Sequence, residues 1–95
     1  KSAIEDYTLA LKIKPDYSLA YYNRGLAKNK LQDYEGEIAD YTKAIEFQPD
    51  YEVAYTKRGL AKYETGDRAG GCKDLSQAVK LGSDLAYNNL IVYCK

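Results

Sequence analysis

The sequence contains no histidine, which removes much of the side-chain chemistry that enzymes use near neutral pH. Histidine-based catalytic triads, histidine zinc sites and the usual general base are all excluded. The adjacent glycines Gly70 and Gly71 lack the lysine and hydroxyl residue of a phosphate-binding loop. No two carboxylates stand out as an acid–base pair. We therefore expect no catalysis, no metal and no cofactor.

An excess of charge of one sign is also absent, because 14 basic and 14 acidic residues cancel and form no like-charged block. Nucleic-acid binding normally requires a basic face, so we expect no nucleic-acid partner. The longest uncharged run of interest, residues 85–94, is far shorter than the roughly 20 residues that span a bilayer. No signal peptide is visible. We expect no membrane insertion, and the start at Lys1 suits a mature, trimmed or excised chain.

The sequence does contain an internal repeat, in which the segment 4–28 corresponds to the segment 38–62. In this comparison 15 of 25 positions are identical. The matches include Pro15-Asp16-Tyr17 with Pro49-Asp50-Tyr51, and Arg24-Gly25-Leu26-Ala27-Lys28 with Arg58-Gly59-Leu60-Ala61-Lys62. The two segments are offset by 34 residues, and an offset of this length is typical of stacked helical repeats.

Apolar residues recur at helical spacing within each period, and Pro15 and Pro49 stand just beyond two of these stripes, where a helix must stop. Tight turns are predicted at residues 30–33 and 65–67, the second with Gly66 in a left-handed conformation. The predicted helices cover residues 2–14, 18–31, 34–47, 52–65, 68–81 and 84–94.

The repeat resembles the tetratricopeptide repeat family in its aromatic, glycine, small-residue and proline positions. One repeat fills them with Tyr21, Gly25, Tyr41, Ala44 and Pro49, and the next has Tyr55, Gly59, Leu75 and Ala78. The resemblance implies an all-α fold of antiparallel helix-turn-helix hairpins, stacked in a right-handed solenoid of about six helices. It implies one domain over 1–95: half a repeat at 1–17, full repeats at 18–51 and 52–83, and a capping helix at 84–95.

Two features depart from the family pattern. Glu37 stands where alanine is usual, and we interpret it as a side chain that extends to solvent beside Gly36. Arginine stands at 24 and 58 where leucine is usual, while aspartate recurs at 6, 40 and 74. These residues predict a repeated structural ion pair, with two possible registers. The first is Arg24–Asp40 with Arg58–Asp74, and the second is Asp6–Arg24 with Asp40–Arg58.

The two cysteines, Cys72 and Cys94, form no CxxC motif. Aligning the last helix with the start of a repeat places them opposite each other on neighbouring helices. They are either two small buried apolar residues or a disulfide that fastens the cap. The protein would then be cytoplasmic in the first case, and periplasmic or secreted in the second.

In the family the first helix of each hairpin lines a concave groove, and the resemblance implies that this groove binds an extended peptide of an unidentified partner protein. Asn23 and Lys57 resemble part of a clamp for a terminal carboxylate, although Asn89 stands where a basic residue would be needed. A second hypothesis is a structural end-piece of a longer solenoid, or a module that self-associates through its end helices. The implied groove residues are Tyr22, Asn23, Leu26, Asn29, Lys30, Thr56, Lys57, Leu60, Tyr63, Glu64, Asn88 and Asn89.

Overall fold

The computed structural model describes residues 2–94, which form six α-helices and no β-strand. Each predicted helix is found, with ends within one residue of those expected. No helix in this range is both long enough and apolar enough to cross a membrane. The helices are α1 (Ala3–Ile13), α2 (Ser18–Lys30), α3 (Tyr34–Phe47), α4 (Glu52–Glu64), α5 (Arg68–Lys80) and α6 (Asp84–Tyr93).

Local signals explain where the helices begin and end. The side chains of Asp33 and Asp67 accept a hydrogen bond from the third backbone N–H of α3 and α5, and Ser83 does the same for α6. Each preceding turn contains one residue with positive φ, which is Gln32 (60°), Gly66 (97°) or Gly82 (102°). The predicted left-handed conformation of Gly66 is therefore confirmed.

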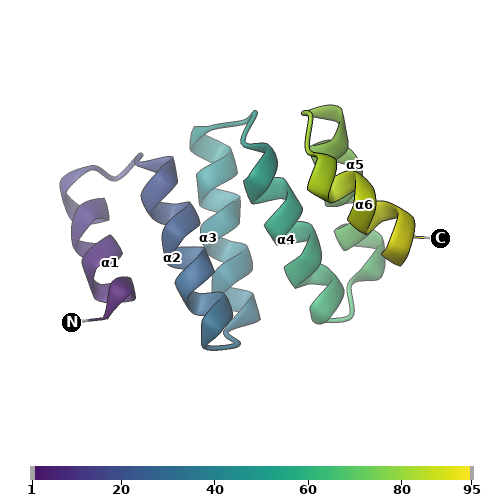
Figure 1. Cartoon of the computed structure of the whole chain (residues 1–95). Helices are drawn as coiled ribbons and strands as arrows, with labels where there is room; N and C mark the ends of the chain where they lie inside the picture. Colours follow the sequence, from purple (N-terminus) through teal and green to yellow (C-terminus); the bar gives the residue numbers. More distant parts are fainter. Residues whose placement is uncertain (1, 95) are drawn as a thin grey trace.

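The helices pack in chain order, each against the next, so the molecule is a single elongated stack of 41 × 25 × 17 Å. The two chain ends lie at opposite ends of this stack (Figure 1). The core is formed by small and aromatic side chains of α3, α5 and their neighbours, with Tyr41, Ala44, Leu75 and Ala78 fully buried. An all-α helical-repeat solenoid is thus the observed fold.

Glycine has a different role in each of the two hairpins. A Cβ atom on Gly59 would lie 2.8 Å from the backbone oxygen of Gly71, so these two glycines let α4 and α5 approach closely. A Cβ on Gly25 would instead lie 2.5 Å from the ring of Tyr41. Gly25 therefore makes room for a side chain, and not for a second backbone.

A pair of arginine–aspartate bridges crosses the hairpins in the first of the two predicted registers. Arg24 donates to both carboxylate oxygens of Asp40 at 2.9 and 2.7 Å, and Arg58 donates to both oxygens of Asp74 at 2.8 Å. The second register, with Asp6 paired to Arg24, is not observed. Asp6 has no ion-pair partner among residues 2–94.

The remaining N–H groups of the arginines join neighbouring hairpins. Arg24 also donates to the hydroxyl of Thr8 on α1, and Arg58 donates to that of Thr42 on α3. Each guanidinium lies over a tyrosine ring of its own helix, at 5.6 and 5.3 Å from the ring centre. Each arginine therefore ties three helices together.

The last helix is fastened to its neighbour by a covalent bond. Cys72 of α5 and Cys94, directly after α6, form a disulfide with Cα atoms 5.8 Å apart. The fully buried Ala86 packs α6 on Leu75 and Ala78, whereas Ile91 and Val92 are 52% and 62% exposed. The outer face of α6 is consequently apolar but uncovered.

Candidate functional site

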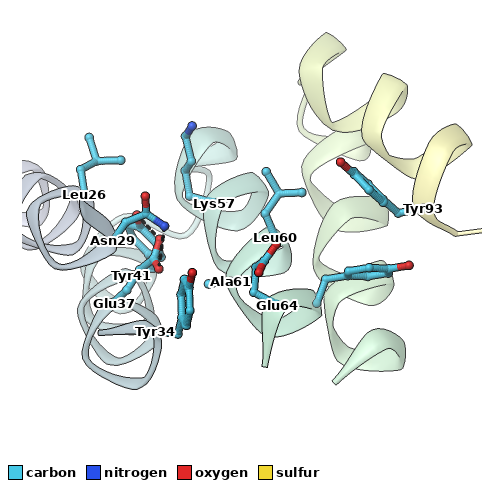
Figure 2. Close-up of a pocket in the computed structure, with 11 residues that line it drawn as sticks. Leu26, Asn29, Tyr34, Glu37, Tyr41, Lys57, Leu60, Ala61, Glu64 and Tyr93 are labelled. Carbon is cyan, nitrogen blue, oxygen red and sulfur yellow. Dashed lines mark hydrogen bonds between the residues drawn. The ribbon is translucent and has the colours of Figure 1, made fainter. Parts of the chain in front are cut away.

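A hollow of about 390 Å³ lies between α2, α3, α4 and α6. We call it the central hollow. Figure 2 shows α4 side chains in its middle, with Leu26 of α2 at one side and Tyr93 of α6 at the other. Its lining consists of Leu26, Asn29, Tyr34, Glu37, Tyr41, Lys57, Leu60, Ala61, Tyr63, Glu64 and Tyr93.

The floor of the central hollow is polar, although it is buried. Glu37 is 2% exposed and accepts hydrogen bonds from the Tyr41 hydroxyl at 2.8 Å and from Nδ2 of Asn29 at 3.2 Å. The interpretation of Glu37 as a side chain that extends to solvent is therefore wrong. Its carboxylate is satisfied internally by two donors that the sequence did not link to it.

Burial sets the protonation behaviour of this floor. Burial raises the pKa of Glu37 above its usual value, while the hydrogen bonds from Asn29 and Tyr41 and the charge of Lys57 oppose that shift. Burial and the bond to Glu37 raise the pKa of Tyr41 far above its usual value, so the phenol remains a proton donor. The floor thus offers fixed hydrogen-bond partners in a partly dehydrated setting.

The rim of the central hollow combines one cation with apolar surface. Lys57 has no carboxylate within 4 Å in residues 2–94, although Glu64 lies on the same helix. Leu26 and Leu60 flank it, and Figure 2 shows the Lys57 ammonium pointing away from the floor. The rim could therefore accept an acidic group beside an apolar one.

An aromatic wall closes the α6 side of the central hollow. The rings of Tyr63 and Tyr93 lie 5.1 Å apart, and the guanidinium of Arg68 lies 5.3 Å from the centre of the Tyr63 ring. Tyr93 directly precedes the disulfide-bonded Cys94. The covalent link of α6 to α5 therefore holds this wall in place.

A second hollow of about 380 Å³, the α1–α2 hollow, shares Leu26 with the first. It also contains the predicted residues Asn23 and Lys30, together with Ile4 and Tyr7 of α1. Because the repeat aligns position 23 with position 57, Asn23 and Lys57 occupy the same place in successive repeats. The two hollows form one continuous face, with Leu26 at their boundary.

The structure distributes the predicted groove residues unequally. Leu26, Asn29, Lys57, Leu60, Tyr63 and Glu64 line the central hollow, and Asn23 and Lys30 line the α1–α2 hollow. Thr56 was predicted as an exposed groove residue, but it lines neither hollow: it is 1% exposed, and its hydroxyl bonds with the backbone oxygen of Glu52 and the hydroxyl of Ser83. Tyr22 packs on the rings of Tyr41 and Tyr51, so it contributes to the core.

The C-terminal helix contributes to the site through a residue that was not predicted. Asn88 and Asn89 line neither hollow, whereas Tyr93 lines the central one. Tyr34, Glu37 and Tyr41 were also missed, since they belong to the second helix of a hairpin. The internal repeat holds a usable signal for Glu37, because the next repeat has Gly71 at that position. The corresponding residues Ala3, Glu37 and Gly71 all differ, which marks a position that is specialised in each repeat.

The central hollow presents hydrogen-bonding groups, one cation and apolar side chains next to one another. No cluster of three or more potential metal ligands occurs in residues 2–94. Within the same range every buried side-chain nitrogen or oxygen has a hydrogen-bond partner. A preformed surface with a cation, amides, tyrosines and leucines suits a ligand that carries both backbone polar groups and side chains.

Comparisons with known proteins agree with the fold. Residues 19–51 match the sequence profile of the tetratricopeptide repeat family. A solved structure described as the first tetratricopeptide repeat domain of Spaghetti (RPAP3), bound to the HSP90 peptide SRMEEVD, is similar over 96% of this chain and 74% of that one. Its TM-score is 0.90 and its sequence identity 24%.

Two structures of the protein MamA are also similar, with TM-scores of 0.80 and 0.78 and 28% identity in each case. They match 82% of this chain, which spans 46% and 43% of their lengths. No curated protein matches the sequence.

Proposed function

We propose that the chain, of which residues 19–51 match the tetratricopeptide repeat family, is a protein-interaction module whose concave face binds an extended segment of a partner protein. The central hollow carries this proposal, since it presents a preformed polar floor and a rim with one unpaired cation. A similar fold in complex with an HSP90 peptide supports it. The proposed ligand is an acidic segment with at least one apolar side chain.

The acidic character of the ligand follows from Lys57. Its ammonium has no carboxylate partner among residues 2–94, so a ligand carboxylate would gain a charge-assisted hydrogen bond there. Asn23 is the residue equivalent to Lys57 in the preceding repeat, and its amide could bond to the same extended ligand. A terminal carboxylate could use both residues, which is the form of clamp that the sequence suggests.

The apolar character of the ligand follows from Leu26 and Leu60, which are equivalent residues of successive repeats. Leu26 lies on α2 and Leu60 on α4, and α3 packs on both of these helices. Both leucines line the central hollow, so a ligand that contacts both must cross from one hairpin to the next. This favours an extended segment as the ligand.

The test is an NMR titration of the ¹⁵N-labelled chain with the peptide SRMEEVD, once with a free C-terminal carboxylate and once amidated. We expect shifts at Leu26, Asn29, Lys57 and Tyr63. The variant Lys57→Ala should bind roughly tenfold more weakly, because it loses a charged hydrogen bond. Lys12→Ala, an exposed lysine on α1, is the matched control and should bind as the unaltered chain does.

Shifts confined to residues outside both hollows would contradict the proposal, as would equal binding by the Lys57→Ala and Lys12→Ala variants. Loss of binding on amidation would assign the terminal carboxylate to the rim. Equal binding of both peptide forms would assign an acidic side chain to Lys57 instead.

A second candidate function, a structural end-piece or self-associating module, is favoured by the exposed apolar side chains of the end helices. Ile13 is 86% exposed and Val92 is 62% exposed. This function predicts a mass that increases with protein concentration in sedimentation experiments, with no peptide-induced shifts in either hollow.

A further inference from the structure

We propose that the α1 end of the stack docks the first helix of a further tetratricopeptide hairpin, and that this helix carries the pattern Tyr-x-Arg-Gly. The inference concerns a different surface from the central hollow and does not depend on a peptide ligand. It rests on the internal repeat, in which α1 corresponds to α3 and then to α5. Both of those helices are already covered by the first helix of a hairpin. The helix that covers α3 carries Tyr-x-Arg-Gly at residues 22–25, and the helix that covers α5 carries Thr-x-Arg-Gly at residues 56–59.

The arginine of the pattern follows from Asp6. Its counterparts Asp40 and Asp74 are only 3% and 5% exposed, and each receives two N–H groups from an arginine of the preceding helix. Asp6 itself is exposed and has no ion-pair partner in residues 2–94. A docked helix with arginine at the place of Arg24 would complete the third bridge of the series.

The glycine of the pattern follows from Tyr7. Its counterpart Tyr41 is completely buried, because Gly25 of the covering helix leaves no side chain in its way. A Cβ atom at that place would lie 2.5 Å from the ring. Tyr7 is only partly buried, and a helix that covers it in the same manner requires a residue without a Cβ.

The tyrosine of the pattern follows from a small hollow of about 250 Å³ beside α1, which Tyr7, Ala10, Tyr17 and Ala20 help to line. One repeat later the corresponding place is filled by the ring of Tyr22. The Tyr22 ring lies 5.7 Å from the Tyr41 ring and 5.2 Å from the Tyr51 ring. These two rings correspond to Tyr7 and Tyr17, so a tyrosine two residues before the arginine would fill the small hollow.

A second copy of this chain does not supply these three residues from its free end. The helix exposed at that end is α6, which aligns with α4 through the match of Ala86-Tyr87 to Ala54-Tyr55. In that alignment Asn88, Leu90 and Ile91 stand at the tyrosine, arginine and glycine positions. Leu90 cannot pair with Asp6, and Ile91 would collide with Tyr7.

The test places the docking helix in the same polypeptide. A copy of residues 17–34 is joined directly before Lys1, which keeps the register of the repeat. The control carries the same extension with asparagine, leucine and isoleucine at the positions copied from Tyr22, Arg24 and Gly25. We expect the first extension to raise the midpoint of thermal unfolding by roughly 5 °C or more over the control.

The variant Asp6→Asn separates specific docking from a general effect of added helix. It should lower the midpoint of the chain that carries the matching extension by several degrees, and leave the unextended chain within about one degree. Equal stabilisation by the two extensions would overturn the proposal. So would an equal effect of Asp6→Asn in both chains, or self-association of the unextended chain through α1, which would make a second copy the occupant.

Discussion

At the scale of single residues, the buried arginine–aspartate bridges are the most informative feature of the stack. Asp74 accepts hydrogen bonds from Nε and Nη2 of Arg58, and Nζ of Lys62 lies 3.1 Å from the same carboxylate. The hydrogen bonds to Asp74 raise the pKa of Arg58 above its usual value, although burial acts in the opposite direction. Replacing one partner would leave the other charge buried with incomplete compensation.

The change Arg58→Leu should therefore lower the free energy of unfolding by about 3 kcal/mol, even though leucine is the usual residue at this position in the family. The double change Arg58→Leu with Asp74→Leu should cost clearly less, because no buried charge remains. Urea denaturation of the single and double variants measures both values. Lys43→Ala, which removes an exposed pair with Glu46, is the control and should cost less than about 0.5 kcal/mol. A single variant no less stable than this control would contradict the prediction.

Sequence reasoning identified these bridges because arginine and aspartate both recur with the repeat. It could not choose between the two registers, since Asp6 and Asp40 stand on either side of Arg24 at similar separations along the chain. Glu37 was misread for the opposite reason. It occurs in one repeat only, and its partners Asn29 and Tyr41 become visible only when α2 and α3 are packed together.

At the scale of elements, the three hairpin turns share one backbone geometry but differ in sequence. Gly66 and Gly82 adopt positive φ without a steric penalty, whereas Gln32 carries a side chain at φ 60°. In all three turns the residue after this position donates its backbone N–H to a carbonyl five residues earlier. The α2–α3 turn therefore holds avoidable strain.

The change Gln32→Gly should raise the free energy of unfolding by about 1 kcal/mol, because glycine adopts the left-handed conformation more readily than glutamine. Gly66→Ala introduces the opposite change at the equivalent position and should lower it by about 1 kcal/mol. Thermal or urea unfolding of both variants shows whether the free energy of unfolding rises in the first and falls in the second. A destabilised Gln32→Gly variant would show that the glutamine side chain contributes an interaction that outweighs the strain.

The helices could be predicted from apolar periodicity, and prolines and capping residues mark their ends. The packing between helices was harder to predict. The sequence suggests that Gly25 and Gly59 have the same role, but Gly25 faces a tyrosine ring and Gly59 faces the backbone of Gly71. Tyr41 in one repeat corresponds to Leu75 in the next, and Glu37 corresponds to Gly71, so the two helix pairs meet through different groups. Pairwise packing of this kind cannot be read from either helix alone.

At the scale of the whole molecule, the disulfide determines how firmly the C-terminal end of the stack is held. The bond joins Cys72 to Cys94 and fixes the end of α6, which carries Tyr93, beside Tyr63. Replacing both cysteines by serine should lower the free energy of unfolding by about 3 kcal/mol, because the unfolded chain regains the entropy of an open loop.

Urea denaturation with and without dithiothreitol tests this expectation. Reduction should destabilise the unaltered chain to about the level of the double serine variant, and it should leave that variant unchanged. If reduction has no effect on the unaltered chain, the cysteines are not bonded in solution, and they act as two small apolar residues.

The arrangement of helices in chain order also has a kinetic consequence. Because each helix packs mainly on its neighbours in the sequence, most native contacts close short loops, and chains of this kind fold quickly and can begin at any repeat. The α6 end of the stack is cross-linked by the disulfide, whereas at the other end α1 has one uncovered face. We therefore expect unfolding to start at α1 and to proceed toward α6, with amide hydrogen exchange fastest in α1.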